Sequence, residues 1–270
     1  MFEAFYWIFK TEGVKQQIFY LLGRTGILIA LYLIIIALSF LNPILLIVNP
    51  ILLFIFGLLI CFLWSGYYWE LTEQIIGRDF DVVASTVYDG RIKNKYNIEL
   101  PELSFKKFIW RGFASFIATL ILIVPYVLLI AAGIYSIKIG SENALLGNIR
   151  SYLPIVAAIA LSIFLFPALM WNYAVRNSII AVLNIRKAIF IIGNYTGKYL
   201  WNVFLMFALN ILINGIFLIA ENSFLAIGYF NTNLAKVFLI FVVLVHFITV
   251  IYQMFVNAYL LGTITPPAEG

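Results

Sequence analysis

The sequence predicts an all-α integral membrane protein with a bundle of six transmembrane helices. Hydrophobic residues make up 64% of the 270 residues and charged residues 11%, whereas soluble domains are about 25% charged. The mean hydropathy is +1.04. No charged side chain occurs from Thr25 to Trp69, a run long enough for two crossings at about 20 apolar residues each. The apolar runs do not alternate with polar residues as membrane β-strands do, so helices are predicted.

The six spans follow from the uncharged runs and their breaks. In the first run, Asn42-Pro43 and Asn49-Pro50 mark a turn between two spans. Four further uncharged runs cover 112–137, 151–175, 199–220 and 237–268. The predicted spans are 25–41, 50–74, 112–137, 152–176, 198–220 and 237–262. We expect one membrane domain over 1–270, in which 77–102 is the substantial polar loop.

The distribution of basic residues predicts the orientation. If the N-terminus is inside, only Lys138, Arg150 and Lys236 of the 17 Lys and Arg residues lie in outer segments. Cytoplasmic loops are enriched in Lys and Arg, so both termini and the loop 77–102 are predicted to be cytoplasmic. The net charge of +5 lies on this inner rim and not on a soluble domain. We therefore expect membrane lipids as partners and no nucleic acid.

The chain shows signs of a threefold internal repeat. Gly26, Gly112 and Gly197 recur at nearly equal spacing, each near the start of an outward span. The proposed units are 1–76, 101–179 and 184–264. Each would consist of an interfacial amphipathic helix followed by a helical hairpin. The predicted interfacial helices are 2–10, 103–112 and 183–193, and Glu70, Asn172 and Asn257 would be equivalent positions.

Several motifs resemble a known family. They are LPEL (100–103), FPALMWNYAVRNSIIAVLN (166–184), GNYTGKYLWNVFL (193–205) and NAYLLGTI (257–264). The chain from about Gly66 to Ile264 resembles a prokaryotic membrane family catalogued as domain of unknown function number four thousand and thirteen. Leu103 stands where that family usually has Trp. The resemblance implies a multi-pass protein of a prokaryotic cytoplasmic membrane, and it brings no catalytic residues.

Polar side chains inside the last two spans form one candidate site. His246 lies roughly 15 Å from the outer end of its predicted span, near the bilayer centre, and Gln253 and Asn257 follow on the same face. Asn210 and Asn214 lie one turn apart on the preceding span. Polar residues in spans are candidates for function, or they hold helices together by hydrogen bonds. No Asp or Glu is expected at the depth of His246, so a neutral, structural imidazole is predicted.

A second candidate cluster lies at the inner ends of the second and fourth spans. It consists of Glu70, Glu73, Asn172, Arg176 and Asn177. We expect an ion pair of Glu70 or Glu73 with Arg176 at the membrane border. A gate or a ligand contact is the alternative role.

No enzymatic motif is present in the sequence, and no catalytic residue, metal ligand or cofactor is predicted. Three hypotheses stay open. The first is a non-catalytic accessory or structural subunit, or a scaffold, that contacts other membrane protein chains. The second is a permease-like transporter of a weakly polar or amphipathic solute, with a partner ATPase. The third is an intramembrane lipid-modifying enzyme. We favour the first because polar groups inside the spans are few.

Overall fold

The computed structural model describes residues 7, 9, 11, 13–39, 43–76, 100–140, 145–228 and 232–264, and all regular structure in them is helical. In chain order the elements are α2 (Val14–Ser39), α3 (Pro43–Ile75), α5 (Phe105–Gly140), α6 (Leu145–Phe164), α7 (Phe166–Arg176), the 3₁₀ helix η2 (Ile179–Leu183), α8 (Ile185–Asn194), α9 (Thr196–Gly228) and α10 (Thr232–Gly262). The predicted all-α class is confirmed.

Six segments in the described part of the chain are long and apolar enough to cross a membrane, as the sequence predicts. They are Val14–Ser39, Val48–Ile75, Phe105–Tyr135, Tyr152–Arg176, Thr196–Ser223 and Val237–Gly262. Several extend beyond the predicted limits because nothing in the flanking sequence stops a helix.

The predicted interfacial helices have different outcomes. α5 begins at Phe105 and continues without a break, so most of 103–112 forms its first turns, and the prediction of a separate helix there is wrong. α8 is a separate helix that matches most of 183–193. Most of 2–10 lies outside the described residues, as does the polar loop 77–102 up to residue 99.

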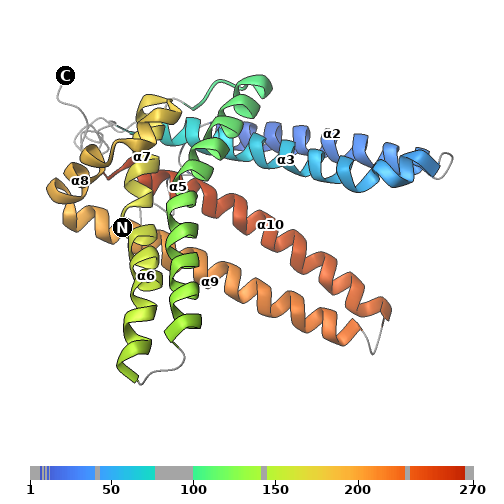
Figure 1. Ribbon diagram of the computed structural model, residues 1–270. Coiled ribbons are helices and arrows are strands. Elements are labelled where there is room, and N and C mark those ends of the chain that lie inside the picture. Colours follow the sequence, from blue (N-terminus) through green and yellow to red (C-terminus); the bar gives the residue numbers. More distant parts are fainter. Residues whose placement is uncertain are drawn as a thin grey trace, which may run out of the picture.

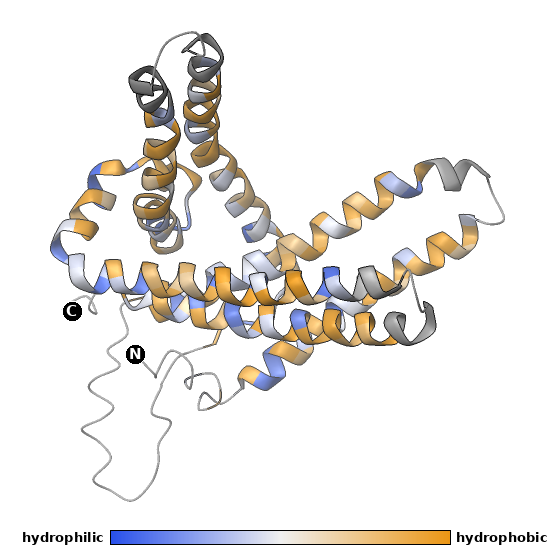
Figure 2. Ribbon diagram, turned by 90° about the horizontal axis from the view of Figure 1, so that it is seen from below, coloured by the Kyte–Doolittle hydropathy of each residue, from blue (hydrophilic) through white to orange (hydrophobic). Residues whose placement is uncertain are grey.

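The long helices pair into three hairpins, α2 with α3, α5 with α6, and α9 with α10. Figure 1 shows the three hairpins pointing in different directions from the region around α7. We call the end of each hairpin away from its loop the base. Figure 2 shows apolar residues along most of each hairpin. α3 also packs against α5 and α10, so it joins the three hairpins.

Two glycines allow α3 and α5 to cross at close range. A Cβ atom added at Gly66 would lie well under 3.0 Å from the carbonyl oxygen of Phe108, and one at Gly112 equally close to that of Phe62. The hydroxyl groups of Ser65 and Ser115 share a hydrogen bond of 2.9 Å at the same crossing. Small residues permit this approach of helix backbones in membranes.

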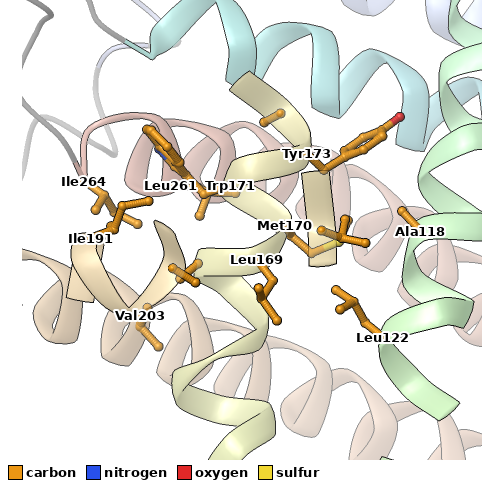
Figure 3. Packing of buried hydrophobic residues seen from close by; sticks show 14 of the residues in the cluster. Ala118, Leu122, Leu169, Met170, Trp171, Tyr173, Ile191, Val203, Leu261 and Ile264 are labelled. Carbon is orange, nitrogen blue, oxygen red and sulfur yellow. The ribbon is translucent and has the colours of Figure 1, made fainter. Parts of the chain in front are cut away.

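The fourth span is broken between α6 and α7. Pro167 has no N–H group to donate to the carbonyl of Ile163, four residues earlier. The next carbonyl, that of Phe164, accepts a hydrogen bond from the Tyr199 hydroxyl of α9. α7 then runs through a buried apolar core. Figure 3 shows its side chains among residues of the neighbouring helices, which include Ala118, Leu122, Ile191, Val203, Leu261 and Ile264.

The three glycines of the proposed repeat do not share one packing role. A Cβ atom at Gly26 or Gly197 would meet nothing within 4 Å, in contrast to Gly112. The three hairpins follow one another in the predicted order. Structural equivalence of the units 1–76, 101–179 and 184–264 stays a prediction, which superposition of the three would test.

Candidate functional site

An ionic cluster built around a buried Glu70–Arg111 pair lies where the base of α3 meets α5. It consists of Glu70, Glu73, Lys107 and Arg111, and the side chains of Glu70 and Arg111 are only 2% and 3% exposed. Arg111 Nη1 donates to one carboxylate oxygen of Glu70 and to one of Glu73. Lys107 Nζ lies 2.7 Å from the other oxygen of Glu70. Two carboxylates are thus balanced by two cations.

Arg111 also ties the ionic cluster to α7. Its Nη2 atom donates to the carbonyl oxygen of Ala174 at 3.2 Å, in the last turn of α7, where carbonyls lack partners within the helix. The Tyr173 hydroxyl donates to the backbone carbonyl of Arg111 at 2.9 Å. The guanidinium carbon lies 6.0 Å from the Tyr173 ring centre. One arginine therefore connects α3, α5 and α7.

The predicted ion pair with Arg176 is wrong, since the recorded partners of Glu70 and Glu73 are Arg111 and Lys107. The α3–α5 crossing brings Arg111 to Glu70, because Arg111 precedes Gly112 and Glu70 lies one turn after Gly66. Sequence reasoning placed Arg111 only among the basic residues of the inner rim.

The other members of the predicted inner-end cluster shape the end of α7. Asn172 is buried, and its side-chain amide donates to the carbonyl of Asn184 at 3.1 Å. Asn177 ends the helix in a left-handed conformation with φ of 46°, which Asn tolerates better than most residues. Arg176 is exposed. Partial burial of Lys187 lowers the pKa of its ammonium group, and the charge of Arg176 lowers that pKa further.

Polar side chains of α9 and α10 form a continuous row, which we call the seam and define as Asn210, Asn214, Glu221, His246 and Gln253. Gln253 Nε2 donates to Asn210 Oδ1 at 2.6 Å. His246 Nε2 lies 3.3 Å from Asn214 Oδ1, and His246 Nδ1 lies 2.7 Å from Glu221 Oε1. The Phe217 ring stacks on the imidazole at 4.5 Å. The structure therefore brings together four of the five residues predicted for this site.

Asn257 lies apart from these recorded contacts. Its Oδ1 atom is buried and has no hydrogen-bond partner among the described residues.

The expectation that no carboxylate reaches His246 is wrong. Glu221 lies one turn beyond Phe217, which faces His246. Side chains of an α-helix lean toward the N-terminus of that helix. Glu221 therefore leans away from the loop between α9 and α10. His246, on the antiparallel helix α10, leans toward that loop, so the two side chains approach each other. Both ring nitrogens face oxygen atoms. His246 is therefore paired through both ring nitrogens and is not an isolated imidazole.

We expect Glu221→Leu to weaken the α9–α10 hairpin by about 0.6–1.7 kcal/mol, the range for hydrogen bonds between membrane helices. Asn222→Leu is the control, because the recorded bond of that exposed side chain goes to Leu218 of its own helix. The free energy of unfolding in mild detergent, measured by titration with a denaturing detergent, compares the two variants. Equal losses would show that the contact with His246 contributes nothing to the hairpin.

Among the described residues, no group of three or more His, Cys, Asp or Glu side chains is placed to hold a metal ion. Comparisons with protein-family models, curated proteins and solved structures found no match to this chain. The likeness of 166–184 and 193–205 to the family of unknown function stays a prediction.

Proposed function

We propose that this multi-pass membrane protein is non-catalytic and acts as an accessory or structural subunit that scaffolds a membrane assembly. The proposal rests on helices that are joined at the base and on apolar surfaces that the rest of the chain leaves uncovered along the hairpins. The ionic cluster joins α3, α5 and α7 at the base. Away from the base, large apolar side chains such as Ile211 (71% exposed) and Leu153 (68% exposed) have little cover from the rest of the chain.

Those apolar surfaces support two kinds of partner. Exposed apolar side chains on membrane helices suit lipid chains, and they suit the helices of other membrane proteins equally well. Under the predicted orientation, both termini are cytoplasmic and the ionic cluster lies near the cytoplasmic face of a prokaryotic inner membrane. Three diverging hairpins then offer separate surfaces to neighbouring chains, which is the arrangement a scaffold needs.

Photo-crosslinking in native membranes tests this function. A photoreactive phenylalanine analogue replaces Ile211 or Leu218, which lie two turns apart on one face of α9, or Leu212 or Ile219 on an adjoining face. A scaffold should form the same protein adduct at both positions of one face and at neither position of the other. Val203, which is 2% exposed, is the buried control. Lipid adducts alone at all four exposed positions would contradict the role.

A permease-like transporter is the second candidate, and the Glu221–His246 pair favours it. The pair is titratable and lies inside the candidate spans Thr196–Ser223 and Val237–Gly262, where ionisable residues commonly mark ion or solute pathways. Water accessibility separates the two roles. If the protein is a scaffold, a membrane-impermeant thiol reagent should not modify the variant His246→Cys. If it is a transporter, the reagent should modify that variant.

A further inference from the structure

An apolar cavity lies where α3, α7, α9 and α10 meet. Its volume is about 230 Å³, and its walls include Trp69 of α3, Pro167 and Met170 of α7, Met206 and Asn210 of α9, and Leu261 of α10. Two of the three hairpins, α2–α3 and α9–α10, therefore contribute to the wall together with α7. The cavity lies beside the break at Pro167, between the end of α6 and the start of α7.

The wall offers little to a polar ligand. Asn210 carries a side-chain amide in the wall, and each of its two polar atoms already has a hydrogen-bond partner in the protein. Its Nδ2 donates to the carbonyl of Met206 at 2.6 Å, and its Oδ1 accepts from Gln253. A polar group that entered the cavity would lose its bonds to water without compensation.

The size of the cavity suits hydrocarbon. An engineered apolar cavity of about 150 Å³ in another protein stays dry and binds benzene, and this cavity is larger. Met170 and Met206 have flexible thioether side chains, which adapt to ligands of irregular shape. The neighbouring α9 residue Phe207, another wall residue, is 37% exposed, and Phe204 is 60% exposed. Both lie within a candidate membrane span, so we expect lipid chains on this side of the cavity.

We propose that the cavity binds one acyl chain of a bilayer lipid, which fills the space among α3, α7, α9 and α10. The bound chain completes the packing of these four helices where the protein's own side chains leave a gap. The site is independent of the proposed scaffold role, because the cavity is formed by the fold itself.

A phosphatidylcholine with a photoreactive diazirine at the end of one acyl chain tests the site. The protein is reconstituted in bilayers of phosphatidylcholine that contain a small fraction of this probe. After illumination, mass spectrometry locates the modified residues. We expect labelling at Trp69, Met170 and Met206 to exceed labelling at the lipid-facing Ile211 severalfold, because a chain held in the cavity stays near its walls.

Met206→Trp should fill the cavity and reduce labelling of Trp69 and Met170 severalfold. The matched control is Phe204→Trp, which adds the same side chain to an exposed position of α9 and should leave that labelling unchanged. If Met206→Trp does not fold, Met206→Phe adds less volume and serves the same purpose. Wall labelling no stronger than at Ile211, or labelling that a folded filling variant leaves unchanged, would overturn the proposal.

Discussion

Replacing Arg111 by leucine is expected to destabilise the protein by about 3 kcal/mol. Removal of one partner from a buried ion pair costs about 3–5 kcal/mol, because the other charge stays buried without compensation. We expect the lower end of this range, since Lys107 remains 2.7 Å from Glu70. Arg111→Leu also removes the bond to Ala174, so α7 should loosen together with α3 and α5.

Arg186→Leu is the matched control, because Arg186 lies exposed on α8. Its loss should change the free energy of unfolding by much less. The double variant Glu70→Leu/Arg111→Leu should recover part of the stability, because it removes both buried charges. Denaturing-detergent titration in micelles measures all three. Similar losses for Arg111→Leu and Arg186→Leu would show that the ionic cluster does not hold the base together.

Gly112→Ala is expected to cost about 1–3 kcal/mol, the usual cost of forcing extra volume into a packed interface. The added methyl group would overlap the backbone of Phe62. Backbone atoms cannot move away by a change of rotamer as a flexible side chain can, so α3 and α5 must separate. Gly66→Ala should have a similar effect from the other side of the crossing, where it meets the backbone of Phe108.

Gly57→Ala and Gly215→Ala are the controls, because a Cβ atom at either position would meet nothing within 4 Å. Both should be neutral or slightly stabilising, since Ala favours helix by about 1 kcal/mol over Gly. The same unfolding titration measures all four variants. Equal effects at Gly112 and Gly57 would mean that the crossing does not require a small residue.

The helical class and the six spans were predictable because length and hydropathy determine them directly. A run without charge such as Thr25 to Trp69 has few alternatives to crossing a bilayer. The grouping of Asn210, Asn214, His246 and Gln253 was predictable for a similar reason. A short connection makes neighbouring spans antiparallel, and helical periodicity then places these side chains on facing surfaces.

The ionic cluster depends on which helices cross and at which residues. Arg176 and Arg111 both lie near the predicted inner rim, and only the close approach at Gly66 and Gly112 brings Arg111 to Glu70. Glu221 was not predicted as part of the site because it falls just beyond the predicted span 198–220. Its contact with His246 also depends on the direction in which both side chains lean.

The hairpins are joined at their bases and separate toward their loops. Spin-label distances in lipid nanodiscs test this arrangement most directly. In the first pair, the spin labels are attached to Cys61 and to Phe116→Cys. Both lie beside the α3–α5 crossing, where the ring centres of Phe62 and Phe116 are 5.6 Å apart. The other pair, in a Cys61→Ala background, places cysteines at Phe54 and Leu128, which are exposed and lie further along the same two helices toward the loops. We expect a clearly longer distance for the second pair, because the hairpins diverge toward their loops in Figure 1. Equal distances for the two pairs, as in a compact parallel bundle, would contradict it.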